Sequence, residues 1–293
     1  MSRKYGIGAI LIVGVFAVIA VAIAWARFDR DKDGIPDFYL WKRFSGKAHA
    51  GQYAGLDGVT IYYETYGKGP PVLVLHGGAA FLETMHYQIT DLASDHFVIA
   101  PDSRGHGRSS DGPGPLHYDA MAEDIVGLMN RLHIARADVV GWSDGGIVGL
   151  DLAMRHSDRI RRLVAIGANF DVAGMVDPAS PNPYDSASLA GVRDFYHSVS
   201  PTPQNWPGFY AKVQRMWATE PHYAVADLGK IRAPVLVIAG EHDIVRRDHT
   251  DALARAIHGA REIIIPGASH SAPLEDPKTV DSAIRAFLSS APV

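Results

Sequence analysis

Short runs of apolar residues alternate with segments of helical periodicity from about residue 52 onward, and this alternation constrains the fold most strongly. The apolar runs are continuous and bounded by turn residues, as expected of strands buried on both faces of a sheet. Strands are expected at 59–66, 71–75, 97–100, 138–141, 163–166, 235–239 and 263–265, and helices at 118–132, 147–155 and 279–288. Strands that alternate with helices predict an α/β fold, in which a mostly parallel sheet carries helices on both faces.

One interval between two expected strands, residues 171–229, is too long for an ordinary connection. It is rich in proline and aromatic residues and contains two expected helices, around 189–198 and 209–218. Connections of this length usually have a function of their own. Since ligands bind at the carboxyl edge of such sheets, we expect this insert to form a lid over that edge. The alternative is a packing insert with no role in binding.

The N-terminus differs in composition from the remainder of the chain. Residues 5–26 contain no charged side chain. About 22 residues in a helix span roughly 33 Å, which is enough to cross a bilayer. We therefore expect residues 1–28 to be a single-pass membrane anchor, with Arg3 and Lys4 favouring an extracytoplasmic position for the rest of the chain. The alternative is a cleaved signal peptide ending at 24–26, which would give a secreted or periplasmic protein.

An acidic and aromatic linker is expected at 29–50, between this anchor and a globular α/β domain at 51–293. The carboxylates within 29–37 have the spacing that opens a calcium-binding loop, but Leu40 stands where a bidentate Glu is required. A charged linker is the favoured interpretation, and calcium binding remains the alternative. Aromatic and basic residues are mixed in 38–44, which favours a short helix at a membrane surface.

Charge and cysteine content exclude several classes of function. The chain has 293 residues, a net charge of −4 and no cysteine. Disulfides, a thiol nucleophile and cysteine-ligated metals are therefore excluded. The slightly acidic balance argues against nucleic acid as a partner, because such a partner requires a basic surface. We expect no metal and no cofactor, and the oligomeric state is left open.

A candidate nucleophile lies in Gly141-Trp142-Ser143-Asp144-Gly145, between an expected strand and an expected helix. In the pattern G-x-S-x-G, small residues on both sides of the serine allow the chain to turn sharply. The turn presents the hydroxyl at a helix N-terminus, whose dipole favours developing negative charge. We expect Ser143 to be the catalytic nucleophile.

A serine nucleophile needs a base, and the base needs an orienting acid. His270 follows the last expected strand, and Asp243 follows the strand before it. Both are therefore expected at the carboxyl end of the sheet, where Ser143 also lies. We expect His270 to be the base and Asp243 the acid, with Glu241 and Asp171 as alternative acids.

The segment His76-Gly77-Gly78 follows the strand expected at 71–75 and is expected to complete an oxyanion hole. Gly78 is expected to supply one backbone N–H group, with Ala79 as the alternative, and Asp144 the other. Glycine allows the backbone to approach a reacting oxygen closely. His76 itself is expected to be a structural residue of the turn.

The side chain of Asp144 is expected to emerge beside the nucleophile. A carboxylate buried there without a partner would be costly. One solution is a protein partner or a structural water. The other is the ammonium group of a substrate, which would make Asp144 a substrate-binding residue.

Five segments, in this order along the chain, resemble the α/β-hydrolase superfamily. They are LHGG (75–78), PDSRGHGRSS (101–110), GWSDGG (141–146), AGEHD (239–243) and PGASH (266–270). The resemblance covers about 55–288 and implies a largely parallel eight-stranded sheet, a helical cap and a Ser-Asp-His triad in that chain order. The segment GWSDGG also resembles the valacyclovir-hydrolase branch, which acts on α-amino acid esters.

The resemblance implies an enzyme that forms an acyl-enzyme on Ser143 from a small-molecule carboxylic ester or a related acyl substrate. It further implies that His270 then activates water to release the acid. Lactone opening, C–C bond hydrolysis, acyl transfer and perhydrolysis use the same triad and remain alternatives. A membrane-tethered binding protein with an idle triad is the alternative from a different class.

Overall fold

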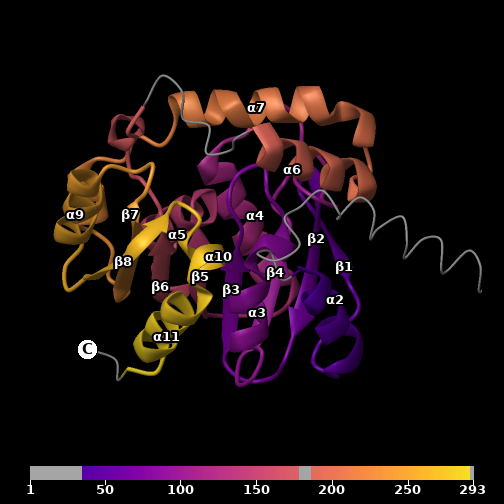
Figure 1. Cartoon of the computed structure of the whole chain (residues 1–293), viewed down its shortest axis with the longest axis horizontal. Helices are drawn as coiled ribbons and strands as arrows, with labels where there is room; N and C mark the ends of the chain where they lie inside the picture. The colour runs from indigo at the N-terminus through magenta and orange to yellow at the C-terminus, as the bar shows by residue number, and fades with distance from the viewer. Residues whose placement is uncertain (1–34, 178–185, 291–293) are drawn as a thin grey trace, which may run out of the picture.

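A sheet of eight strands forms the centre of the computed structural model, which describes residues 35–177 and 186–290 (Figure 1). The strands are β1 (Gln52–Leu56), β2 (Val59–Tyr66), β3 (Pro71–Leu75), β4 (Phe97–Pro101), β5 (Ala137–Trp142), β6 (Ile160–Ile166), β7 (Val235–His242) and β8 (Arg261–Ser269). Their order across the sheet is β1-β2-β4-β3-β5-β6-β7-β8. Strand β2 pairs antiparallel with β1 and β4, and all other pairs are parallel. The predicted α/β fold with a mostly parallel eight-stranded sheet is confirmed.

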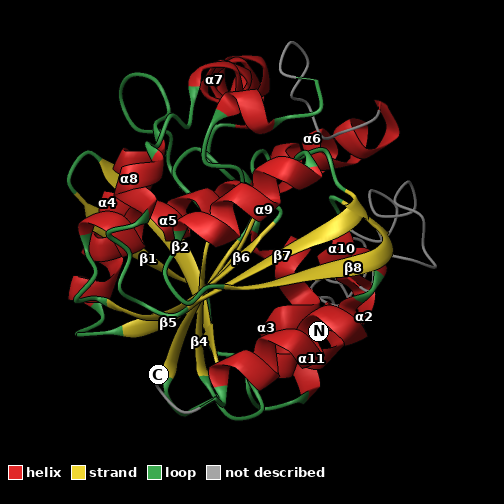
Figure 2. Ribbon diagram, turned by 90° about the vertical axis from the view of Figure 1, so that its left-hand side faces the viewer, coloured by secondary structure: helices red, strands yellow, loops and turns green. Residues whose placement is uncertain are grey.

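Helices cover both faces of the sheet (Figure 2). One face carries α2 (Ile35–Phe44), α3 (His86–Leu92), α10 (Ala272–Glu275) and α11 (Pro277–Leu288), and the other carries α4 (Tyr118–Arg131), α5 (Asp144–Arg155), α8 (Val225–Leu228) and α9 (Arg247–Ala256). Alternate side chains of the central strands enter two separate hydrophobic cores, one under each layer of helices. The central strands are therefore apolar on both faces, which explains their continuous apolar runs.

The parallel strands β5, β7 and β8 end at the same edge of the sheet. Strands β7 and β8 pair regularly as far as Gly240 and Ile265. A register shift follows, after which His242 pairs with Ser269. Asp243 directly follows the end of β7, and His270 directly follows the end of β8. The shifted pairing therefore places these two side chains close together.

Two helices of the predicted insert, α6 (Ser186–Val199) and α7 (Trp206–Thr219), lie across the top of the sheet in Figure 1. Aromatic packing holds them there, since the Phe209 ring is fully buried and stacks on Tyr196 with ring centroids 5.0 Å apart. An ion pair between Lys212 and Asp111 ties α7 to the loop after β4. The role of this insert as a lid stays a prediction, as do the limits of the anchor, linker and domain.

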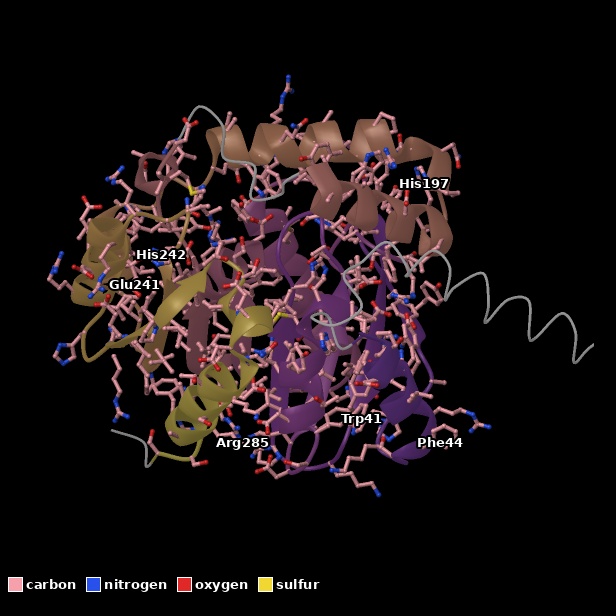
Figure 3. The ribbon with its side chains drawn as sticks, viewed as in Figure 1. Trp41, Phe44, His197, Glu241, His242 and Arg285 are labelled. Atoms are coloured by element: carbon pink, nitrogen blue, oxygen red, sulfur yellow. The ribbon has the colours of Figure 1, made fainter. Side chains whose placement is uncertain are left out.

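Helix α2 docks on the domain through an aromatic and ionic contact. Phe38 is only 1 % exposed and packs against Tyr66 with ring centroids 6.0 Å apart. Lys42 forms an ion pair with the buried Glu64 at 2.5 Å. Trp41 also packs inward, whereas Phe44 is exposed at the end of the helix (Figure 3). The expectation that this segment lies on a membrane surface is therefore wrong for Phe38 and Trp41, because the domain itself covers them.

The prediction of a membrane-anchored, single-pass protein is corrected by the structure. Over residues 35–177 and 186–290, no helix is both long enough and apolar enough to span a bilayer. The longest helices there have 14 residues, about 21 Å, against the roughly 30 Å of a hydrocarbon core. The predicted span at 5–26 and the acidic residues at 29–33 lie outside the described residues. The prediction of an anchor rested only on the apolar character of residues 5–26.

Candidate active site

Ser143 occupies a strained turn between β5 and α5. Its backbone has φ +54° and ψ −121°, a conformation that L-residues rarely adopt. A Cβ atom on Gly141 would lie 2.2 Å from the carbonyl oxygen of Gly145, and one on Gly145 would lie 2.3 Å from the carbonyl oxygen of Leu75. Only glycine therefore fits at both flanking positions of this turn. The strain and the tight packing hold the Ser143 hydroxyl at the N-terminus of α5.

The structure brings Ser143, His270 and Asp243 together in one hydrogen-bonded chain. His270 Nε2 lies 2.9 Å from Ser143 Oγ, and His270 Nδ1 lies 2.7 Å from Asp243 Oδ1. The indole N–H of Trp142 donates to the His270 carbonyl oxygen at 2.8 Å and so fixes the loop that carries the imidazole. This arrangement can remove a proton from the serine hydroxyl and stabilise the imidazolium that results.

Asp243 is held in its ionised form. Burial alone would raise the pKa of this carboxyl, but the charge and hydrogen bond of His270 lower it overall. The Val245 backbone N–H also donates to Asp243 Oδ1, at 3.0 Å. An ionised carboxylate accepts the Nδ1–H of His270, which leaves Nε2 as the atom that faces the serine.

The two alternative acids lie elsewhere. Glu241 accepts the backbone N–H of Gly267 at 2.8 Å and lies on the exposed side of the sheet edge (Figure 3). Asp171 pairs with His222 at 2.9 Å and caps a short helical turn through the backbone N–H of Ala173. In the described part of the chain, Asp243 is the acid that the structure places against His270.

The candidate oxyanion hole lies between the β3 loop and the start of α5. Gly78 packs against Asp144 and α7, since a Cβ atom on Gly78 would lie 2.2 Å from Asp144 Oδ2 and 2.7 Å from Trp217 Nε1. The alternative donor, Ala79, uses its N–H to bond His106 Nε2 at 3.0 Å. The Ala79 N–H is therefore bonded within the protein, and the Gly78 N–H stays the predicted donor from this loop, beside the backbone N–H of Asp144.

The Asp144 carboxylate has two protein partners. The Tyr118 hydroxyl donates to Oδ1 at 3.0 Å, and the Trp217 indole N–H donates to Oδ1 and Oδ2 at 3.0 and 3.1 Å. Burial raises the pKa of Asp144 to about 6, because these donors only partly offset the loss of hydration. Asp144 is therefore ionised at neutral pH in a nearly closed environment. Protein partners for this carboxylate were one of the two expected solutions, and the contacts show them. A role for Asp144 in substrate binding stays a prediction.

A cavity opens beside the nucleophile. Its lining consists of Tyr118, Ser143, Asp144, Gly167, Asn169, Met175, Trp217, Glu220, Ile244, Val245 and His270. It contains the carboxylates of Asp144 and Glu220, and none of the described residues that line it is Lys or Arg. Glu220 accepts the backbone N–H of Tyr118 at 3.2 Å and pairs with His117, which ties the end of α7 to the start of α4.

Sequence reasoning missed Tyr118, Trp217 and Glu220, all of which line this cavity. They come from α4, from α7 and from the residue directly after α7, far from Ser143 in sequence. Tyr118 and Trp217 each fit the apolar face of an expected helix. No local sequence pattern therefore indicated that they belong to a site. The aromatic richness of the insert was the one signal that pointed to a binding role.

Comparisons with known proteins find several relatives of this chain. A family model described as the alpha/beta hydrolase family matches residues 72–283, a range that contains Ser143, Asp243 and His270. Human serine hydrolase BPHL is 29% identical over 238 residues, covering 74% of this chain and 78% of that protein. Esterase YbfF from Escherichia coli is 30% identical over 238 residues, covering 74% of this chain and 92% of that protein. The crystal structure of the enol-lactonase from Burkholderia xenovorans LB400 matches with a TM-score of 0.66 and 25% identity, over 82% of this chain and all of that chain.

Proposed function

Since the chain belongs to the alpha/beta hydrolase family and is a hydrolase, we propose that it cleaves small carboxylic esters, neutral or cationic, through an acyl-enzyme on Ser143. The observation that carries this proposal is the hydrogen-bonded chain from Asp243 through His270 to Ser143, which opens into the cavity. C–C bond hydrolysis, acyl transfer and perhydrolysis use the same triad, and lactone opening is an outcome that the test below separates from ester cleavage.

In the proposed reaction, Ser143 Oγ attacks the ester carbonyl carbon while His270 Nε2 takes the hydroxyl proton. The backbone N–H groups of Gly78 and Asp144 hold the oxyanion of the tetrahedral intermediate. His270 then gives its proton to the leaving alcohol, and the acyl group stays on Ser143. A water molecule, deprotonated by His270, attacks the acyl carbon and releases the carboxylic acid. Asp243 keeps the imidazole in the required tautomer throughout.

The charge of the cavity supports the choice of substrate class. Two carboxylates, Asp144 and Glu220, line it, and none of the described lining residues is Lys or Arg. A substrate that carries its own carboxylate would meet like charge in an environment of low dielectric constant. Esters that are neutral or positively charged avoid this penalty. The serine hydrolase and esterase among the relatives support ester cleavage as the reaction.

Three esters of similar size, one neutral, one with an α-ammonium group and one with a terminal carboxylate, test the proposal. We expect the carboxylate ester to have a kcat/KM at least about 10-fold below that of the neutral ester, which corresponds to roughly 1.4 kcal/mol. A carboxylate ester hydrolysed fastest would contradict the charge argument. A chain that opens a lactone but cleaves none of the three esters would overturn the proposal of an esterase.

The predicted substrate-binding role of Asp144 has a pH signature. An ionised carboxylate accepts more hydrogen bonds than the two partners of Asp144 supply, so an ammonium group could still bind it. We expect wild type to prefer an α-amino ester over its des-amino analogue by about 10- to 150-fold in kcat/KM. Because burial raises the pKa of Asp144 to about 6, the preference should be present at pH 7 and lost as pH falls below 6.

The ratio of the two rates is the informative quantity, because both substrates depend equally on His270. Asp144→Asn should abolish the preference and keep activity on the neutral ester, since the backbone N–H survives the substitution. A ratio near one in wild type, or a preference that persists in Asp144→Asn, would leave Asp144 a structural residue.

A further inference from the structure

The loop that carries Gly78 depends on an unusual contact at its next residue. Ala79 has φ +54°, in the left-handed region, and its N–H donates to His106 Nε2 at 3.0 Å. Gly78 has no Cβ atom to restrict its own backbone rotation. The Gly78 N–H belongs to the preceding peptide, so the position of this donor depends on how firmly Ala79 is held on the other side of the Gly78 Cα atom.

His106 is fixed as a neutral hydrogen-bond acceptor. Its ring is 1 % exposed, and its Nδ1–H donates to the Arg104 carbonyl oxygen at 2.9 Å. That bond leaves Nε2 with a lone pair aimed at Ala79. Burial lowers the pKa of His106 to about 3, and the neighbouring His76 ring acts in the same direction. The imidazole keeps this acceptor over the whole pH range in which a histidine base works.

The lid helix α7 touches the same loop from two directions. Phe209 of α7 packs edge-on against the His106 ring, with centroids 4.8 Å apart and planes at 84°. Trp217, two turns further along α7, fills the space beside Gly78 and bonds Asp144. Phe209 is fully buried, so its contact with His106 belongs to the packed interior and not to a surface.

We propose that His106 is a positioning residue, which holds Ala79 directly after the Gly78 donor and so transmits the docking of α7 to the oxyanion hole. The inference rests on the proposed function, because it assigns the Gly78 N–H to the reacting oxygen. With His106 in place, the Gly78 donor is oriented before substrate arrives. With α7 displaced, His106 loses the Phe209 contact and the donor loses its alignment. The oxyanion hole is thus complete only when α7 is docked.

A trifluoromethyl ketone tests this role, because it forms an adduct that uses the oxyanion hole. Ser143 Oγ adds to the ketone carbon, the carbonyl π bond becomes the oxyanion, and the serine proton moves to His270. The secondary alcohol of the same skeleton binds the cavity without forming the adduct. The affinity for the ketone therefore reports the oxyanion hole, and the affinity for the alcohol reports the cavity alone.

His106→Phe keeps a ring against Phe209 but removes the acceptor. We expect kcat for the neutral ester and affinity for the ketone to fall together by about 10- to 100-fold, less than the loss of a whole oxyanion donor. KM and the affinity for the alcohol should stay within about 2-fold, because the cavity is intact. His106→Gln, whose Oε1 can take the place of Nε2, should recover most of the ketone affinity.

His249 supplies a matched control. It is also a buried imidazole whose Nε2 accepts a backbone N–H, that of Phe170, at 3.1 Å, and it stacks on the Phe170 ring. His249→Phe should lower thermal stability as His106→Phe does and should leave the ratio of ketone affinity to alcohol affinity unchanged. Equal loss of that ratio in both variants would overturn the positioning role.

Phe209→Leu tests whether α7 acts on the oxyanion hole through His106. This test is still available if His106→Phe fails to fold. It loosens the packing of His106 without removing its acceptor, and we expect ketone affinity to fall about 3- to 10-fold with alcohol affinity unchanged. Unchanged ketone affinity in Phe209→Leu would overturn the link to the lid. A wild-type protein that binds the alcohol but not the ketone would instead overturn the proposed function, whatever the variants do.

Discussion

Replacing Ser143 by alanine is expected to lower kcat for the preferred ester by at least about 10⁴-fold, because no other group can form the acyl-enzyme. The change removes one oxygen atom and leaves the backbone at φ +54° with a side chain that still has a Cβ atom. We therefore expect the free energy of unfolding to stay within about 1 kcal/mol of wild type. Initial rates and a denaturant titration on the same preparation measure both quantities.

The substrate should still bind to Ser143→Ala, since the cavity and the oxyanion donors remain. Equilibrium binding of the secondary alcohol serves as the control for an intact cavity. Turnover by Ser143→Ala within about 10-fold of wild type would contradict a serine nucleophile.

Asp243→Asn is expected to lower kcat by about 10⁴-fold, with little change in KM. Asparagine can turn its amide N–H toward His270 Nδ1, which would favour the tautomer that has its proton on Nε2. That tautomer cannot accept the serine proton. Asparagine also carries no charge to stabilise the imidazolium. A pH–rate profile with the esters described above measures the loss.

The size of this loss depends on whether a neighbouring acid can replace Asp243. Glu241 lies two residues away in sequence but holds the Gly267 backbone N–H, on the exposed side of the strand end. Rescue by Glu241 would require its side chain to release the Gly267 N–H and to turn away from the exposed side. Glu241→Gln is the matched control and should stay within about 2-fold of wild type. A similar loss in both variants would assign the effect to the loop and not to the acid.

The sequence was most informative where local chemistry and sheet topology act together. Strand β3 was predicted with its observed bounds and β5 to within one residue at each end, because both are buried on both faces. Ser143, Asp243 and His270 could be predicted to lie together because each follows a parallel strand, and parallel strands end at one edge. Strand β1 was missed, since it lies at the sheet edge, is mostly exposed and has no apolar periodicity.

Contacts between distant segments could not be predicted. The partners of Asp144 come from α4 and α7, and nothing near Tyr118 or Trp217 in sequence indicates that their donors meet one carboxylate. The choice between Gly78 and Ala79 depended on His106, which lies on another loop. The N-terminal run led to a wrong localisation, because apolar character alone does not establish an anchor. The partners of Asp144 and the bond of Ala79 to His106 depend on tertiary placement, about which residue patterns carry no information.

Labelling with a fluorophosphonate tests the central claim, a serine made nucleophilic by His270 and Asp243, most directly. The serine oxygen displaces fluoride from phosphorus and forms a stable phosphonyl ester, so the modified residue can be located by peptide mass spectrometry. The account predicts one label per chain, on the peptide that contains Ser143, with labelling slowed in Asp243→Asn and absent in Ser143→Ala. A label on any other residue, or an equal extent of labelling in Ser143→Ala, would contradict it.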